Sequence, residues 1–230
     1  MCTGFIKRGD DLLYGFNLDI DPEVWDFRLV KNKKIFTVAI KVGKTLYYTH
    51  GVNAEGCFSN LPYMNGPTDG ARGGKNSVRV DLLTDRYLRN KLSFDELLST
   101  AKMKTVLNVS GASMHSLVGS PDGRMLLLEP QNGFREITED YAAIANFPVL
   151  CELSDYNNPF YGRDRYDTAT KILSESKNDF SVRDGLELFR KVKTEGKWGT
   201  KISFVYSKNE NAVYYCLNGD FEKTEKHCLG

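Results

Sequence analysis

Cys2 is the residue of this sequence best suited to chemistry, because it directly follows the initiator methionine. A cysteine is small enough for that methionine to be removed, which would leave Cys2 as the N-terminal residue. It would then carry both a thiol and a free α-amino group, whose pKa near ~8 lies far below that of lysine. The amine can take the thiol proton at neutral pH, so one residue supplies nucleophile and general base. Cys2 is therefore our candidate catalytic nucleophile, and the alternative is a small buried side chain, as free cysteines commonly are.

The composition argues against several other classes of function. The chain has 230 residues, of which 41% are hydrophobic and 27% charged, with a formal net charge of +1. These values are typical of a soluble globular protein with a sizeable core. Lysine and arginine are scattered, so neither nucleic acid nor a membrane surface is expected as a partner. No apolar run approaches the ~20 residues that span a bilayer, and no basic-then-apolar leader is present. We expect a cytoplasmic protein.

The cysteines and histidines predict no metal site and no cofactor. The cysteines are odd in number and show no CxxC spacing, which favours free thiols over disulfides or zinc ligation. The three histidines lie far from one another and from any cysteine pair. The cysteines are Cys2, Cys57, Cys151, Cys216 and Cys228, and the histidines are His50, His115 and His227.

The elements that must position Cys2 follow one another as strands, helices, strands, helices and a last hairpin. Apolar or alternating runs between Gly, Asn and Asp turns predict strands, and apolar residues at helical spacing predict helices. Ser93 and Glu96 form a capping-box pattern before one helix. Residues 64–75, rich in Gly, Asn, Pro and Asp, predict a loop over a site. The predicted strands are 3–8, 12–17, 35–42, 45–50, 57–61, 115–119, 125–129, 202–207 and 212–217, and the predicted helices are 80–90, 94–103, 163–176 and 183–194. This order indicates a single α+β domain over residues 1–230, with layers around antiparallel sheets.

Six motifs of the sequence occur in the order found in one known family. They are CTG at 2–4, GFNLD at 15–19, GVNAEGC at 51–57, HSLVGSPDG at 115–123 followed by MLLLE at 125–129, ANFP at 145–148 and DRY at 164–166. In these motifs the chain resembles the choloylglycine hydrolase and penicillin V acylase family. The resemblance implies an N-terminal-nucleophile (Ntn) hydrolase with a four-layer α-β-β-α sandwich of antiparallel sheets. The insertion that bile salt hydrolases use in tetramer assembly is missing, and a homo-oligomer stays open.

The resemblance also implies roles for particular residues. Asp19 orients the α-amine, and the side-chain amide of Asn146 forms an oxyanion hole with the backbone N–H of Tyr63. Arg165 is the cation near the thiol, with Arg163 as a competing candidate two residues away. Each of the four has an alternative without function: a turn aspartate, an asparagine before a proline, an exposed loop tyrosine and a solvated charge on a helix.

Phe16 is the departure from the family, which usually carries an arginine there to stabilise the thiolate. A phenyl ring cannot do this, and desolvation raises the pKa of a thiol. Either Arg165 or another cation supplies the charge, or activity is reduced. We expect Phe16 and Asn17 to contact the substrate, while packing of Phe16 on its strand stays an alternative.

Two functions follow from these residues. The first is a hydrolase of linear amide C–N bonds in small N-acyl amides of the bile salt, penicillin V or N-acyl amino acid type. It works through a thioester at Cys2, and another amine could capture the same acyl-enzyme. The second is a non-catalytic or redox-sensing ligand-binding protein of the same fold, which Phe16 favours.

Overall fold

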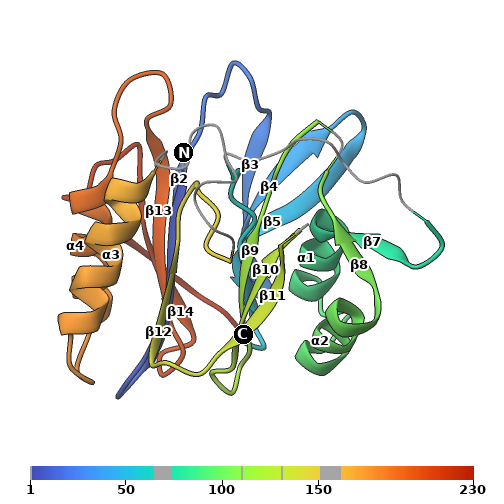
Figure 1. The fold of residues 1–230 in the computed structure, drawn as a ribbon. Coiled ribbons are helices and arrows are strands. Elements are labelled where there is room, and N and C mark those ends of the chain that lie inside the picture. Colours follow the sequence, from blue (N-terminus) through green and yellow to red (C-terminus); the bar gives the residue numbers. More distant parts are fainter. Residues whose placement is uncertain (1, 65–73, 110, 131, 151–161) are drawn as a thin grey trace.

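Two antiparallel sheets lie face to face between two pairs of helices (Figure 1). The computed structural model describes residues 2–64, 74–109, 111–130, 132–150 and 162–230. This arrangement confirms the predicted four-layer α-β-β-α sandwich. Within the described residues, none of the helices combines the length and apolar character needed to cross a membrane.

The first sheet contains the strand that begins at Cys2. Its order is β12-β1-β2-β13-β14-β15. The strands are β1 Cys2–Arg8, β2 Leu12–Asp19, β12 Tyr141–Ile144, β13 Thr200–Ser207, β14 Ala212–Leu217 and β15 Glu225–Cys228. Helices α3 (Arg163–Glu175) and α4 (Val182–Val192) cover the outer face of this sheet through a second apolar cluster. Both faces of β1 and β2 are therefore buried.

The second sheet contributes the opposite wall of the sandwich. Its order is β11-β10-β9-β6-β5-β4-β3. The strands are β3 Phe27–Asn32, β4 Ile35–Val42, β5 Thr45–Asn53, β6 Phe58–Ser59, β9 Ser116–Gly119, β10 Met125–Glu129 and β11 Gly133–Ile137. Helices α1 (Val80–Leu88) and α2 (Phe94–Met103) cover its outer face, and β7 (Ser77–Arg79) pairs in parallel with β8 (Thr105–Leu107). The predicted capping box of Ser93 and Glu96 is present at the start of α2.

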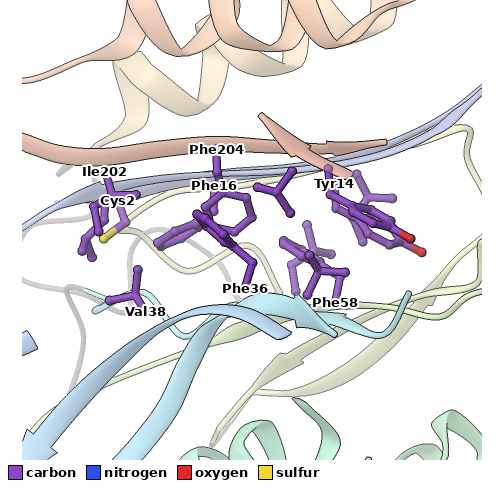
Figure 2. Close-up of a cluster of buried hydrophobic side chains, with 14 of the residues drawn as sticks. Cys2, Tyr14, Phe16, Phe36, Val38, Phe58, Ile202 and Phe204 are labelled. Atoms are coloured by element: carbon purple, nitrogen blue, oxygen red, sulfur yellow. The ribbon is translucent and has the colours of Figure 1, made fainter. Parts of the chain in front are cut away.

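The core between the sheets is rich in aromatic side chains. The ring of Tyr14 stacks between Phe58 and Tyr206, at centroid distances of 4.9 and 5.7 Å. Figure 2 shows this cluster between the sheets, with Cys2 at one end and Tyr14 toward the other. The nucleophile candidate therefore lies where the packed core ends.

Every predicted strand and helix is present, and the differences lie elsewhere. Six strands were not predicted: β3, β7, β8, β11, β12 and β15. The cysteines at 2, 57, 216 and 228 are free, as expected, while Cys151 lies outside the described residues. Most of the predicted loop over 64–75 also lies outside them.

Candidate active site

Cys2 opens β1 with its side chain toward the space between the sheets. Side chains alternate along a strand, so Cys2 and Ile6 share the inner face, where both belong to the apolar core. β1 pairs with β12 from Gly4 onward and with β2 along its whole length, where Cys2 lies opposite Leu18. The side chain is only 5% exposed and lines a cavity.

Asn146 lies just past the end of β12 and holds the backbone nitrogen of Cys2. That nitrogen donates to Oδ1 of Asn146 at 2.5 Å. In a chain that begins at Cys2, this nitrogen is the α-amine. Nδ2 of Asn146 donates to the backbone carbonyl of Tyr63, also at 2.5 Å. The Asn146 amide thus connects the Cys2 nitrogen with the backbone carbonyl of Tyr63.

Arg165, in the first turn of α3, is the cation of the site. Its Nη1 donates to the Cys2 carbonyl at 3.0 Å and lies 3.4 Å from Oδ2 of Asp19, and its Nη2 donates to Oδ1 of Asn146 at 2.9 Å. The residue is buried, whereas the side chain of Arg163 is 40% exposed and pairs with Asp167. Of the two candidates, only Arg165 contacts the Cys2 backbone.

Gly162 makes room for the Arg165 guanidinium. It precedes α3 with a φ of +78°, a left-handed conformation that favours glycine. A Cβ at this position would lie 2.7 Å from Nη2 of Arg165 and 3.2 Å from the backbone nitrogen of Asn146. A glycine at position 162 therefore allows both the left-handed turn before α3 and the observed position of the Arg165 side chain.

Asp19 ends β2 and is buried beside Arg165. Oδ1 accepts from the Thr200 hydroxyl at 2.6 Å and from Nδ2 of Asn17 at 3.0 Å. Burial raises the pKa of Asp19 to about 6, against the opposing effects of the Thr200 hydrogen bond, the N-terminal charge and Arg165. Thr200 was not predicted as a site residue, since a single threonine at the start of a strand carries no signal in the sequence.

The Cys2 thiol is not a preformed thiolate. Burial raises its pKa above the usual value, and the nearby Asp19 carboxylate acts in the same direction. The N-terminal positive charge and Arg165 lower the pKa but do not outweigh burial. A neutral thiol in this setting needs an adjacent base before it can attack.

Tyr63 lines the cavity and is 41% exposed. It lies opposite Met114 in an isolated antiparallel bridge, where Met64 N–H donates to Ser113 and His115 N–H donates to Pro62. The Tyr63 N–H takes part in neither bond. The Tyr63 carbonyl accepts from Nδ2 of Asn146, and the role of the Tyr63 N–H as an oxyanion donor stays a prediction.

Phe16 and Asn17 do not lie where we expected them. Phe16 is completely buried between the sheets and stacks on His50 at a centroid distance of 4.3 Å. Asn17 is also completely buried, and its amide bonds Asp19 and Ser203. Neither residue lines the cavity. In place of substrate contact, Asn17 supports Asp19 through a hydrogen bond and Phe16 packs against His50. For Phe16, the alternative of core packing matches its position.

The cavity has a volume of about 560 Å³ and mainly apolar walls. Its apolar lining consists of Leu18, Ile20, Val24, Trp25, Ile40, Val42, Leu61, Val109, Met114 and Trp198. No lysine or arginine is among the described lining residues, and the lining carboxylate of Asp81 is paired with Arg79. Nor do three or more His, Cys, Asp or Glu side chains of the described ranges gather as metal ligands. The space suits an uncharged organic group next to the Cys2 thiol.

The sequence predicted none of the aromatic cavity residues apart from Tyr63. Trp25 lies between β2 and β3, Trp198 lies between α4 and β13, and His50 lies within β5. Their shared position depends on how the two sheets stack, which no local pattern of the chain reports.

Solved structures of amide hydrolases have the same architecture. A variant of the conjugated bile acid hydrolase from Clostridium perfringens aligns with a TM-score of 0.67 and 12% identity, covering 100% of this chain and 92% of that one. The penicillin V acylase from Agrobacterium tumefaciens aligns with a TM-score of 0.64 and 12% identity, covering 94% and 83%. An N-acylethanolamine-hydrolyzing acid amidase ortholog from Caenorhabditis elegans aligns with a TM-score of 0.57 and 14% identity, covering 90% and 93%.

No family model and no curated protein matches the sequence itself. At identities of 12–14%, the structural likeness establishes the fold and leaves the activity to be argued from the site. The resemblance seen in the six motifs is confirmed at that level. The chain has the N-terminal-nucleophile hydrolase fold of the choloylglycine hydrolases and penicillin V acylases.

Proposed function

We propose that this protein is an amidase that hydrolyses linear C–N bonds in small N-acyl amides, with Cys2 as nucleophile after loss of Met1. The observation that carries the proposal is the 2.5 Å hydrogen bond from the Cys2 nitrogen to Asn146, beside Arg165 and at the wall of an apolar cavity. The bond fixes the group that would act as base. The names of the structural neighbours, all amide hydrolases or acylases, add support.

The first chemical step uses both functional groups of Cys2. The α-amine takes the thiol proton, and the thiolate attacks the amide carbon to form a tetrahedral intermediate. Asn146 Nδ2 and the Tyr63 N–H stabilise the developing oxyanion, for which Nδ2 must exchange its bond to the Tyr63 carbonyl for one to the substrate oxygen. The α-ammonium then protonates the leaving amine, which departs and leaves a thioester. Water attacks the thioester with the amine again acting as base.

Arg165 and Asp19 hold this arrangement in place. Arg165 binds the carbonyl of the nucleophile and the amide of Asn146, so one rigid guanidinium sets the relative position of both. It also supplies the positive charge that Phe16 lacks. Asp19 neutralises the guanidinium and, when ionised, attracts the α-ammonium.

The lining of the cavity indicates which kind of acyl group the substrate carries. Its apolar lining and the pairing of Asp81 with Arg79 favour an uncharged, mainly hydrocarbon or aromatic acyl group. Acyl groups of the bile salt, penicillin V and N-acyl amino acid types all meet this description. Whether water or another amine captures the thioester is a separate question, which added acceptor amines can answer.

The test combines mass spectrometry with activity. We expect the intact mass to lack Met1 and a panel of chromogenic N-acyl amides to contain a substrate. Cys2→Ala should abolish hydrolysis while the protein stays folded, and Cys2→Ser should retain at most a small part of the activity. Cys216→Ala is the matched control, because it removes a buried thiol from the opposite face of the first sheet. Hydrolysis by Cys2→Ala within tenfold of the wild type would refute the mechanism.

A second candidate is a ligand-binding protein without catalysis, favoured by the raised pKa of the buried Cys2 thiol and by Phe16. It predicts a processed, folded protein that binds acyl amides in the cavity and cleaves none of them. Single-turnover mass spectrometry separates the two candidates, since only the enzyme gains the mass of an acyl group on Cys2.

A further inference from the structure

A buried histidine that the proposed mechanism does not use lies in the wall of the cavity. His50 is 4% exposed and lines the same space as Cys2. It belongs to β5 of the second sheet, across the interior from the strand that carries the nucleophile.

A β-bulge turns His50 toward the cavity. In the pairing of β4 with β5, Val38 lies opposite His50 and Ala39 opposite Tyr48, which leaves Thr49 as an extra residue. An extra residue reverses the alternation of side chains along a strand. Tyr47 and His50 are three positions apart and would face opposite sides of a regular sheet, yet both line the cavity.

The imidazole of His50 is held in one protonation state. The Leu61 N–H donates to Nδ1 at 3.0 Å, so the proton of the neutral ring is on Nε2. Burial lowers the pKa of His50 to about 3, and the N-terminal charge acts in the same direction. The ring of Phe16 stacks on it with an interplanar angle of 11°. His50 is thus a fixed hydrogen-bond donor rather than a proton shuttle.

Other polar groups of the cavity wall already have partners within the protein. The Thr49 hydroxyl donates to the Val38 carbonyl, Asp81 is paired with Arg79, and Asn146 donates to Tyr63. For the Nε2–H of His50, in contrast, the described part of the chain supplies no acceptor. A donor in the wall of a cavity can bond to an oxygen of a bound ligand.

We propose that His50 is a substrate-binding residue whose Nε2–H donates to an uncharged oxygen of the acyl group. It selects acyl groups with an ether, hydroxyl or keto oxygen over plain hydrocarbon groups of the same shape. The proposal rests on the proposed amidase function in one respect, namely that the acyl group stays on Cys2 while the amine departs. Since His50 lines the same cavity as Cys2, its side chain would face the acyl group that is bound to Cys2.

The test compares two substrates that differ in one atom, the 4-nitroanilides of phenoxyacetic acid and 3-phenylpropanoic acid. The ether oxygen of the first is a methylene in the second. The two amides differ in intrinsic reactivity, but this difference cancels when the ratio of their kcat/KM values is compared between protein variants.

Two variants separate the donor of His50 from its structural role. In His50→Asn, Oδ1 can accept from the Leu61 N–H, but no atom takes the place of Nε2. In His50→Gln, the side-chain amide nitrogen reaches the place of Nε2, while the acceptor for Leu61 is lost. We expect the ether-to-methylene ratio to fall on the order of 10–100-fold in His50→Asn and to change little in His50→Gln, although the second is the less stable protein. An unchanged ratio in His50→Asn overturns the proposal.

A binding measurement keeps this proposal apart from the amidase hypothesis. Calorimetry with Cys2→Ala gives the Kd ratio of the two amides without turnover. A ratio that falls when His50→Asn is added supports His50 even if the wild type cleaves neither amide. An unaffected ratio contradicts it. If His50→Asn does not fold, NMR of the His50 Nε2–H in Cys2→Ala decides: this signal should shift with the ether amide and not with the methylene amide.

Discussion

Cys2, Asn146, Arg165 and Asp19 form one connected set of charged and polar groups in a buried place. The Asn146 amide oxygen accepts from both the Cys2 nitrogen and Arg165, and Arg165 also lies against Asp19. Each group therefore satisfies another, which is the condition under which buried polar groups are tolerated. Loss of one member leaves the others unpaired, so single substitutions here should act on more than one partner.

The raised pKa of Asp19 predicts an acid limb in the pH dependence of activity. Burial brings this pKa from 3.8 to about 6, so the carboxylate is lost as the pH falls through about 6. We expect kcat/KM to fall on the acid side of this value, because a protonated Asp19 no longer attracts the α-ammonium. The same limb should be absent from the residual activity of Asp19→Asn.

The same shift predicts a pH dependence of stability. Since the folded-state pKa lies above the unfolded value, the folded protein binds the proton more tightly between pH 3.8 and about 6. The contribution of Asp19 to stability is therefore full below this range and is lost as the pH rises through it. As the pH rises from 3.8 to about 6, we expect the melting temperature of the wild type to fall relative to that of Asp19→Asn. The exposed Asp140 offers Asp140→Asn as a control, and a constant gap between wild type and Asp19→Asn would contradict the assignment.

Phe16→Arg is predicted to destabilise the protein rather than to activate the thiol. Phe16 is fully buried against His50 and Phe204, where a lone guanidinium costs roughly 3–5 kcal/mol. For a chain of this size, the melting temperature should fall on the order of 10 °C. Phe16→Leu keeps the site apolar and should melt closer to the wild type. A stable Phe16→Arg whose Cys2 is labelled at lower pH would show that position 16 faces the nucleophile after all.

At the scale of the element, the start of α3 determines where the site arginine lies. Gly162→Ala should lower activity more than stability. A Cβ there would strain the left-handed turn and would also push against Arg165 and Asn146. We expect kcat to fall roughly tenfold or more, since even a 1 Å displacement of a positioned group is costly. Gly219→Ala is the control: its φ is +68°, but the nearest atom to a new Cβ is 3.9 Å away. Equal losses of activity in both variants would mean that strain alone, not the contact with Arg165, is responsible.

The elements that the sequence did not predict share one property. β12 and β15 are the two edges of the first sheet, and β3 and β11 are the two edges of the second. β7 and β8 form a separate two-stranded sheet, in which both strands are edges. Charged side chains on an edge strand prevent further pairing and weaken its apolar pattern, as in β3, β11 and β15. β15, for example, consists of Glu, Lys, His and Cys. β12 is a short strand of Tyr, Ala, Ala and Ile and carries no charge. The central strands β1, β2, β9 and β10 are buried on both faces and gave clear apolar runs.

The residues of the candidate site also fall into a group that the sequence predicted and a group that it did not. Cys2, Asp19, Asn146 and Arg165 were predictable because each lies in a short motif of consecutive residues. Thr200 and His50 were not predictable as site residues. Thr200 meets Asp19 only because β13 lies beside β2, 181 residues along the chain, and His50 reaches the cavity only through a bulge. Contacts set by strand order or by a bulge leave no local pattern to find.

At the scale of the whole molecule, one end of the interior is filled and the other is open to a ligand. Aromatic side chains fill the space around Tyr14, and the cavity begins where β1 begins, at Cys2 (Figure 2). The position of the cavity therefore follows from the position of the first strand. The packed core holds the two sheets apart, so the cavity at this end of the sandwich has rigid walls.

The place of β1 inside a sheet also dictates an order of events during synthesis. β1 and β2 can pair early, but their outer neighbours, β12 and β13, come from residues 141–144 and 200–207. At rates of about 5–20 residues per second, the ribosome needs roughly 10–40 s to reach β13. Once the sheet closes, Cys2 is 5% exposed and its nitrogen is bound by Asn146, out of reach of an aminopeptidase. We therefore expect the proposed removal of Met1 to take place on the nascent chain, before the sheet closes around Cys2.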